Sequence, residues 1–263
     1  MSARTTVTTL CDYLDFAIDA AWQAGRSTLA HYQTGVTIER KRDQSVVTVA
    51  DRSAEQLIRR LITERFPKHA IVGEEFGADE AHSSHRWIID PIDGTTTFVR
   101  GVPFYGVLVA LEIDGVPEVG VAYFPALNEM VSAASGLGCR WNGRLARVSA
   151  VSSLADSTVV YTDSRAVQSR LGEDWNGLMT DTVVQRGWGD CYGHALVATG
   201  RADIMLDPRM NPWDCAALIP ILHEAGGRFT DWRGRVVVDG GDAVSTNGVL
   251  HDRVLQRLAS RSA

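Results

Sequence analysis

The sequence predicts a mixed fold that is α+β in its first half and α/β in its second half. Two apolar segments, residues 105–113 and 117–124, are joined by Asp114-Gly115, a pair typical of a tight β-hairpin turn. Beyond residue 150, strand and helix patterns alternate along the chain, as they do in βα units. These observations predict an antiparallel sheet followed by an alternating region.

In the first half, apolar residues recur at helical spacing in some segments and form short apolar runs in others. Helices are predicted at residues 8–32 and 49–66. Strands are predicted at residues 36–39, 70–72, 86–89, 105–113, 117–124, 129–133 and 137–141.

The second half has shorter elements that alternate in type. Strands are predicted at residues 158–161, 183–185 and 202–206, and helices at 164–171, 190–199 and 212–225. The last helix has clear end signals, with Asn211 as its N-cap, Pro212 in its first turn and Gly226 after its end. Because the composition turns small and polar near residue 149, we expect one domain at residues 1–147 and another at 148–263.

Composition and charge indicate a globular chain that can bury a large core. The 263 residues are 45% hydrophobic, and their net charge is −6. This acidic balance argues against nucleic acid as a partner, and no polybasic segment suits a membrane surface. The four cysteines are scattered, without zinc-site spacing, which is typical of free thiols. The first residues lack the apolar core of a signal peptide, so we expect a cytoplasmic protein.

The segment from Trp87 to Phe98 joins an apolar strand to a polar turn. Asp90 and Asp93 follow the apolar run, and Gly94 opens a threonine-rich stretch. Two carboxylates at a strand end can hold a hard cation, and free N–H groups after Gly94 could hold a phosphate. The alternative is a turn in which Asp, Pro and Gly serve only the backbone geometry.

Further acidic residues lie at the ends of predicted elements. Asp51 and Asp214 each open a helix, and Glu74 ends a strand. These acids also have structural explanations. The helix dipole favours an acid such as Asp51 or Asp214 in the first turn, and Glu75, next to Glu74, could be a solvated loop charge. Because ligand groups converge at strand ends and helix starts, we expect these carboxylates to share one site. Such a site suits Mg²⁺, and two Mg²⁺ ions can stabilise both oxygens of a phosphoryl transfer.

These motifs resemble those of the inositol monophosphatase superfamily. In chain order they are Val47-Thr48-x-Ala50-Asp51, Gly73-Glu74-Glu75, Trp87 to Thr95, Trp213-Asp214-x-Ala216-Ala217 and Glu224-Ala225-Gly226-Gly227. The resemblance covers nearly the whole chain and implies Mg²⁺-dependent hydrolysis of phosphate monoesters. It also implies a layered αβαβα sandwich and a homodimer. Thr97 departs from the pattern, because many members have Asn there.

The resemblance implies a role for each matching position, with two or three Mg²⁺ ions per site. The first ion is expected on Glu74, Asp90 and the Ile92 carbonyl, and the second on Asp90, Asp93 and Asp214. The attacking water would be oriented and activated by Asp51 and Thr95, with Thr48 as a helper. The residues expected to contact the substrate are Glu74, Ile92, Asp93, Gly94, Thr95, Arg186, Asp190, Asp207 and Asp214. Most metal ligands thus fall in residues 1–147, while Asp214 and the specificity residues fall in 148–263.

Residues 98–106 and 187–192 resemble the branch of the family that acts on histidinol phosphate. Histidinol carries an amine and an imidazole, so its pocket should present acidic groups near the phosphate. Asp190 and Asp207 could meet such a cation, and Arg186 could close over the phosphate. Asp190 could instead be a helix N-cap and Arg186 a surface charge. An inositol pocket would also use acids, as acceptors for hydroxyl groups.

Other functions remain open at the level of the sequence. Within the superfamily the main alternative is inositol-1-phosphatase activity, followed by nucleotide 3′-phosphatase or fructose-1,6-bisphosphatase activity. A different class of function would be a phosphoester-binding module without catalysis. The presence of Asp51, Thr95 and both sets of metal ligands argues against such a module.

Overall fold

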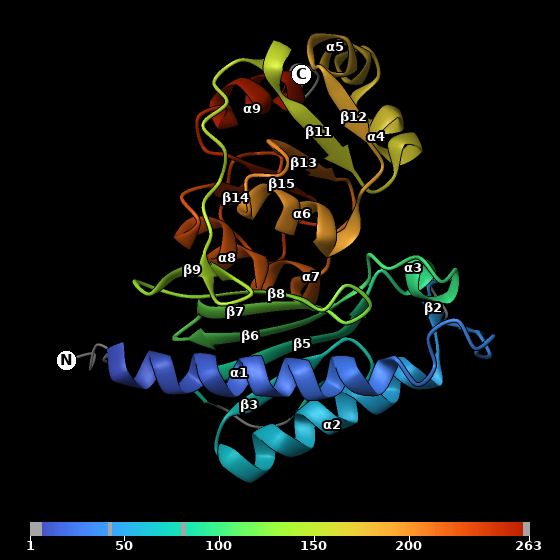
Figure 1. Cartoon of the computed structure of the whole chain (residues 1–263), viewed down its shortest axis with the longest axis vertical. Coiled ribbons are helices and arrows are strands. Elements are labelled where there is room, and N and C mark those ends of the chain that lie inside the picture. Colours follow the sequence, from blue (N-terminus) through green and yellow to red (C-terminus); the bar gives the residue numbers. More distant parts are fainter. Residues whose placement is uncertain (1–6, 42–43, 80–82, 260–263) are drawn as a thin grey trace.

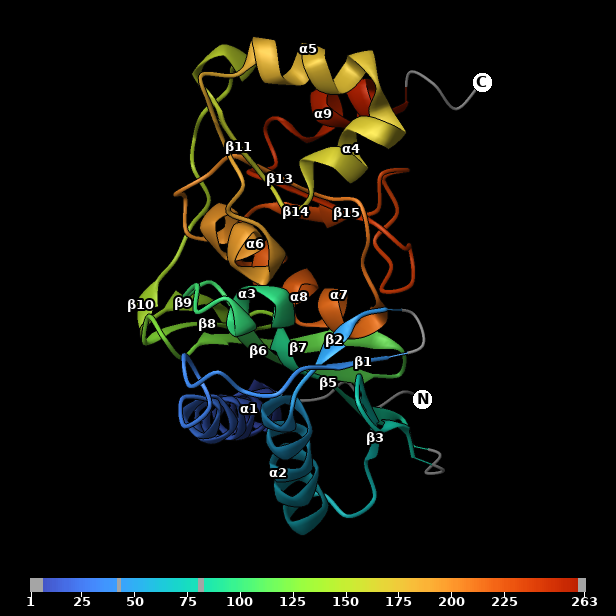
Figure 2. The same ribbon diagram turned by 90° about the vertical axis from the view of Figure 1, so that its right-hand side faces the viewer.

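The computed structural model describes residues 7–41, 44–79 and 83–259 of the chain. Within these ranges, layers of helices alternate with the two larger of three β-sheets along the long axis of the molecule (Figure 1). Figure 2 shows the same five layers from the side. The layering confirms the predicted αβαβα class. The N-terminal residues 1–6, where we expect no signal peptide, lie outside the described ranges.

Helices α1 (Val7–Thr28) and α2 (Val49–Arg65) cover the outer face of the larger sheet. Small side chains such as Ala17 and Ala21 are fully buried, which lets α1 lie close to the strands. The helix ends at Thr28, before the predicted residue 32, and residues 29–35 form turns with positive φ at Gln33 and Gly35.

The larger sheet has the order β10-β9-β8-β7-β6-β5-β3-β4. Its strands are β3 (Ala70–Gly73), β4 (Gly77–Ala78), β5 (His85–Asp93), β6 (Gly106–Ile113), β7 (Val116–Phe124), β8 (Glu129–Ala134), β9 (Gly138–Trp141) and β10 (Arg144–Leu145). Neighbouring strands are antiparallel except β3 and β5, which are parallel. Asp114 and Gly115 form the β6–β7 turn with φ of 52° and 81°, which confirms the predicted hairpin.

The smaller sheet has the order β12-β11-β13-β15-β14. Its strands are β11 (Thr158–Tyr161), β12 (Val184–Arg186), β13 (Ile204–Asp207), β14 (Arg228–Thr230) and β15 (Ala243–Thr246). β11 is parallel to β12 and β13, as the alternation of strands and helices predicts, whereas β15 is antiparallel to β13 and β14. Strands β14 and β15 follow the last predicted helix and were not predicted from the sequence.

The middle layer consists of α6 (Asp190–Ala198), α7 (Pro212–Ala216) and α8 (Leu218–Glu224), which lie between the two sheets. Residues 191–198 of α6 are all buried, because the helix has a sheet on either side of it. The predicted helix at 212–225 is divided at Ala217. Pro220 explains the break, since it has no N–H to donate and its ring crowds the carbonyl of Ala216.

The remaining helices are α4 (Ser164–Leu171), α5 (Glu173–Asp181) and α9 (His251–Ala259), which cover the outer face of the smaller sheet. Of these, the sequence predicted only α4. A small hairpin of β1 (Glu39–Arg40) and β2 (Val46–Val47) lies beside the short helix α3 (Thr95–Val99). The predicted strand 36–39 shares only Glu39 with β1. A short 3₁₀ helix, η1 (Leu154–Asp156), precedes β11.

The chain passes from the larger to the smaller sheet between Leu145 and Thr158. The middle helices nevertheless join both halves, because one hydrophobic core contains Leu108 of β6, Leu218 of α8 and Met205 of β13. The division into domains at residues 147 and 148 therefore stays a prediction.

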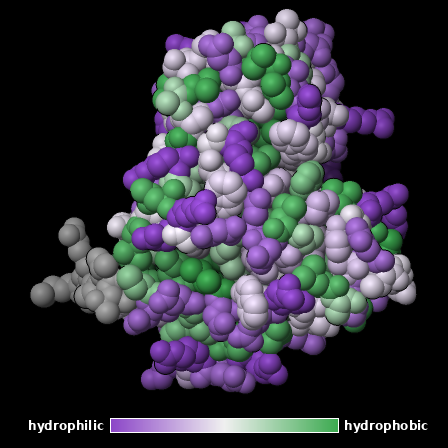
Figure 3. All heavy atoms as spheres, viewed as in Figure 1, coloured by the Kyte–Doolittle hydropathy of each residue, from purple (hydrophilic) through white to green (hydrophobic). Residues whose placement is uncertain are grey.

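The surface mixes side chains of both kinds. Figure 3 shows hydrophilic and hydrophobic residues interspersed over both halves of one face. Among the described residues, no helix combines the length and the apolar character that a membrane span requires.

Candidate active site

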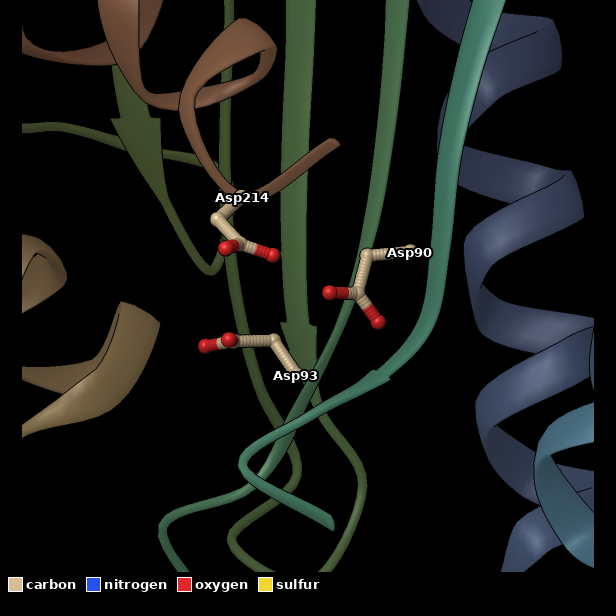
Figure 4. A group of neighbouring side chains, drawn as sticks. All are labelled: Asp90, Asp93 and Asp214. Atoms are coloured by element: carbon tan, nitrogen blue, oxygen red, sulfur yellow. The ribbon is translucent and has the colours of Figure 1, made fainter. Parts of the chain in front are cut away.

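Three aspartates converge where β5 meets the start of α7. One carboxylate oxygen from each of Asp90, Asp93 and Asp214 lies within 4.8 Å of the others, and Figure 4 shows the three side chains facing one another. In a regular strand, residues three apart point to opposite faces. The pairing of β5 with β6 is irregular between Asp90 and Asp93, and this irregularity lets both turn to the same side.

One oxygen of each carboxylate accepts a hydrogen bond from a backbone N–H. The Ile92 N–H donates to Asp90 Oδ1 (3.0 Å), the Cys191 N–H to Asp93 Oδ2 (2.5 Å) and the Asn211 N–H to Asp214 Oδ2 (2.7 Å). These contacts fix the orientation of the carboxylates and leave the other oxygen of each group for a ligand. Asp214 is thus a helix-capping residue and a member of the cluster at once.

The cluster carries uncompensated negative charge. Burial raises the pKa of Asp90 well above its ordinary value, and the charges of Glu74 and Asp93 raise it further. Burial and the charges of Asp190 and Asp214 raise the pKa of Asp93 in the same way. Burial also raises the pKa of Asp214, and the charge of Asp190 raises it further. A divalent cation would relieve this repulsion among the carboxylates.

This donor set fits the predicted metal. Carboxylate oxygens, here from one buried and two partly buried aspartates, are ligands that Mg²⁺ takes in proteins. Asp90, Asp93 and Asp214 would hold such an ion, and Glu74 would extend the set.

Glu74 lies next to this cluster, in the turn after β3. Its Oε1 accepts a hydrogen bond from Lys41 Nζ at 2.8 Å, and Lys41 also contacts Glu75 Oε1 at 2.7 Å. Burial raises the pKa of Glu74 to about 7, although Lys41 lowers it. The turn itself is held by buried Glu55, which accepts hydrogen bonds from the N–H groups of Glu75 (2.7 Å) and Phe76 (3.3 Å).

Asp51 faces the site from the first turn of α2. Thr48 donates to Asp51 Oδ2 through its backbone N–H (2.8 Å) and its hydroxyl (2.6 Å), while Asp51 Oδ1 accepts from the Thr95 hydroxyl at 3.2 Å. Thr95 also contacts the Ile92 carbonyl at 3.0 Å. Burial raises the pKa of Asp51, and the hydrogen bonds from Thr48 lower it. The three residues predicted to handle the attacking water therefore form one hydrogen-bonded chain.

Gly94 lies at the start of α3 with φ of 80°, a left-handed conformation that favours glycine. The first N–H groups of a helix have no carbonyl partner within the helix, so those of Gly94 and Thr95 can face a ligand. Both residues line an open cavity of about 970 Å³, and Glu74 lines it as well.

The predicted specificity residues occupy three different environments. Asp190 lines the cavity, and its Oδ2 accepts from the Thr97 hydroxyl at 2.8 Å. Asp207 is buried and accepts from the Thr162 hydroxyl at 2.6 Å. Burial raises the pKa of Asp207 to about 7, while that hydrogen bond lowers it. Arg186 is exposed, donates to the Gln185 carbonyl at 2.7 Å and lies outside the cavity lining.

Sequence reasoning gave no role to four residues that shape the site: Lys41, Glu55, Thr97 and Thr162. Two of them had a signal, since Thr97 departs from the family pattern and Glu55 falls four residues after Asp51 on the buried face of α2. The partners of Lys41, Thr97 and Thr162 come from segments distant in the sequence, such as Asp190 for Thr97. Asp190 itself is not an N-cap, since Gly189 holds that position.

The fold and the site define a class of protein, namely a layered αβαβα protein with an acidic cluster that could bind a metal ion. Comparison with known proteins agrees, since the model of the inositol monophosphatase family matches residues 10–263. The chain belongs to this family.

Several relatives are similar over most of their length. A histidinol-phosphatase of Chlorobaculum parvum is 45% identical over 240 residues, which are 90% of this chain and 93% of the relative. A histidinol-phosphatase of Mycobacterium tuberculosis is 43% identical over 84% of this chain and 87% of its own. Among solved structures, the extragenic suppressor protein suhB of Bartonella henselae superposes with a TM-score of 0.89 at 30% identity. It covers 95% of this chain and 99% of its own.

Proposed function

We propose that this protein hydrolyses histidinol phosphate to histidinol and phosphate with Mg²⁺ as its cofactor. The observation that carries this proposal is the Asp190 carboxylate in the cavity wall, next to the predicted phosphate position at Gly94. Relatives named histidinol-phosphatase support the same substrate, because they are 43% and 45% identical to this chain. The metal would be held by Glu74 and the aspartates of the cluster, as two or three ions.

When bound, Mg²⁺ supplies positive charge for the phosphate oxygens and makes a bound water more acidic. Thr95 orients the attacking water. Asp51 Oδ1, which lies 3.2 Å from the Thr95 hydroxyl oxygen, accepts the proton that the water releases. The raised pKa of Asp51 makes it a better base, and Thr48 holds its other oxygen in place. The N–H groups of Gly94 and Thr95 bind oxygens of the transferred phosphoryl group.

The test compares kcat/KM for L-histidinol phosphate and myo-inositol 1-phosphate in metal-stripped protein titrated with Mg²⁺. We expect turnover only with the metal, and a preference for histidinol phosphate of at least about tenfold, or ~1.4 kcal/mol. In the control variant Asp93→Asn, both activities should fall at least about a hundredfold, because a charged ligand is lost.

Other outcomes contradict the proposal in different ways. Equal or reversed preference would assign the protein to inositol phosphate hydrolysis. Tight binding of both esters without turnover at any Mg²⁺ concentration would indicate a binding module.

We also propose that the protein is a homodimer of the cytoplasm. Cys11, Cys139, Cys191 and Cys215 are all free, as expected for a reducing compartment. Sedimentation equilibrium at micromolar concentration measures the assembly, and a single species at the monomer mass would contradict the dimer.

A further inference from the structure

Asp190 has an unusual backbone conformation at the cavity wall. It is the first residue of α6, and its φ is 51°, in the left-handed region that non-glycine residues rarely adopt. A residue persists in such a conformation when its surroundings hold it there. Its own N–H donates to the Thr162 hydroxyl at 2.9 Å, and the next N–H, from Cys191, donates to Asp93 at 2.5 Å.

Two threonines hold Asp190, one through its carboxylate and one through its backbone. The Thr97 hydroxyl donates to Asp190 Oδ2 at 2.8 Å. The Thr162 hydroxyl, which accepts from the Asp190 N–H, donates its own proton to Asp207 Oδ2 at 2.6 Å. Asp207 therefore supports Asp190 through Thr162, which explains why it is buried although the sequence predicted a direct contact with substrate.

The Asp190 carboxylate lies against the predicted phosphate position. A Cβ atom added to Gly94 would be 2.8 Å from Asp190 Oδ2, so only glycine allows this approach. In the described part of the chain Asp190 accepts a side-chain hydrogen bond from Thr97 and forms no ion pair with a basic side chain. An anion fixed in this way next to a phosphate position is suited to a cation on the substrate itself.

The chemistry of the substrate decides which cation this is. In histidinol phosphate the ammonium is bonded to the carbon next to the phosphoester carbon, whereas the imidazole lies one carbon further away. Because the Asp190 side chain packs against Gly94, the predicted phosphate position, its carboxylate suits the nearer group, the ammonium. This step rests on the proposed function, since it takes histidinol phosphate as the substrate.

We propose that Asp190 binds the ammonium group of a 2-aminoalkyl phosphate and that Thr97 is the positioning residue that sets this specificity. Thr162 and Asp207 are the backbone supports of the same carboxylate. The substrate class is then defined by an amine at a fixed distance from the phosphate, and the imidazole contributes separately.

The experiment uses a matched pair of substrates, histidinol phosphate and 3-(imidazol-4-yl)propyl phosphate, which lacks only the amine. The amine ratio is kcat/KM for the first divided by kcat/KM for the second. We expect a wild-type ratio of roughly ten to a hundred, the strength of a charged hydrogen bond. Thr97→Val should lower this ratio about tenfold, mainly through the KM of histidinol phosphate.

The controls separate positioning from structure. Thr97→Ser keeps the hydroxyl and should restore the ratio, and Thr96→Val, at the exposed neighbouring position, should keep it. In an Asp190→Asn background, Thr97→Val should cause no further loss, because Thr97 acts only through Asp190.

Each failure has its own signature. A wild-type ratio in Thr97→Val, with a lost ratio in Asp190→Asn, would overturn the role of Thr97. If Asp190→Asn keeps the wild-type amine ratio, the ammonium assignment is overturned. If that variant loses Mg²⁺ affinity instead of the amine ratio, Asp190 is a metal-site residue. Preference of the wild type for myo-inositol 1-phosphate would instead refute the proposed function.

Discussion

At the scale of single residues, the acids of the site also serve helix geometry. Asp51 closes a capping box with Thr48, and Asp214 closes one with Asn211. In both, Oδ2 binds the cap and leaves Oδ1 free to face the site, where Asp51 Oδ1 accepts from Thr95. The structural explanation of these acids is therefore compatible with their predicted functional roles, because a carboxylate has two oxygens.

His194 is a buried titratable residue outside the catalytic machinery. It lies in α6, its Nδ1 is 2.6 Å from Ser245 Oγ, and its Nε2 has no hydrogen-bond partner in the part of the chain that the structure describes. Burial lowers the pKa of His194 to about 3. A neutral imidazole with one unpaired nitrogen is tolerated, whereas a buried imidazolium is not.

This predicts a specific loss of stability in acid. As the pH falls below about 6.5 the unfolded chain binds a proton at residue 194 and the folded chain does not, which costs up to ~1.4 kcal/mol per pH unit down to pH 3. Between pH 7 and pH 5 the free energy of unfolding should fall in both proteins. We expect the fall in His194→Gln to be smaller than in the wild type by about 2 kcal/mol. Urea unfolding at both pH values measures the difference. His223→Gln, at an exposed position, should match the wild type, and equal losses in all three proteins would refute the role of His194.

At the scale of elements, α2 supports the turn that presents Glu74. Buried Glu55 on α2 forms an ion pair with Arg59 at 2.7 Å. It also accepts hydrogen bonds from two backbone N–H groups of the turn after β3. Gly73 allows this contact, since a Cβ there would be 2.0 Å from Glu55 Oε1. The helix that provides Asp51 thus also positions Glu74.

We expect Glu55→Gln to lower the free energy of unfolding by about 1–3 kcal/mol, because an amide nitrogen would then face N–H donors. Mg²⁺ affinity measured by calorimetry should fall with it, since Glu74 loses its support. The control is Glu64→Gln, whose exposed partner Arg60 is 3.9 Å away. Unchanged stability and unchanged Mg²⁺ affinity in Glu55→Gln would show that the turn after β3 keeps its conformation without the Glu55 carboxylate.

At the scale of the whole molecule, the site depends on how the middle helices pack on the larger sheet. Gly120 in β7 lies under the α7–α8 junction, where an added Cβ would be 2.1 Å from the Ala217 carbonyl oxygen. Backbone cannot move away as a flexible side chain can. The distance between α7, which carries Asp214, and β5, which carries Asp90, therefore depends on a glycine far from both in the sequence.

Gly120→Ala should lower the free energy of unfolding by about 1–3 kcal/mol through overpacking. It should also weaken Mg²⁺ binding, because α7 moves away from β5. Gly177→Ala is the matched control, since its Cβ would meet only the flexible end of Arg257, at 3.3 Å. Thermal unfolding with and without Mg²⁺ measures both effects, and a Gly120→Ala protein with wild-type metal stabilisation would contradict this coupling.

The sequence by itself determined the local elements and the chemical types of the site. Helical spacing in α2, the Asp114-Gly115 hairpin and the acids at element ends depend on neighbours within a few residues, and local physics decides them. It also predicted that Asp90, Asp93 and Asp214 share a site, from the kind of element ends on which they lie. It did not predict α5, α9, β14 or β15.

Only the tertiary structure decided the relations between distant segments. It supplied the irregularity of β5 that turns Asp90 and Asp93 to one side, and the contact of Thr97 with Asp190. It also moved Asp207 from the predicted substrate wall to a buried support behind Thr162. Such contacts join residues far apart in the chain, and no local pattern encodes them, because they arise only when the layers pack.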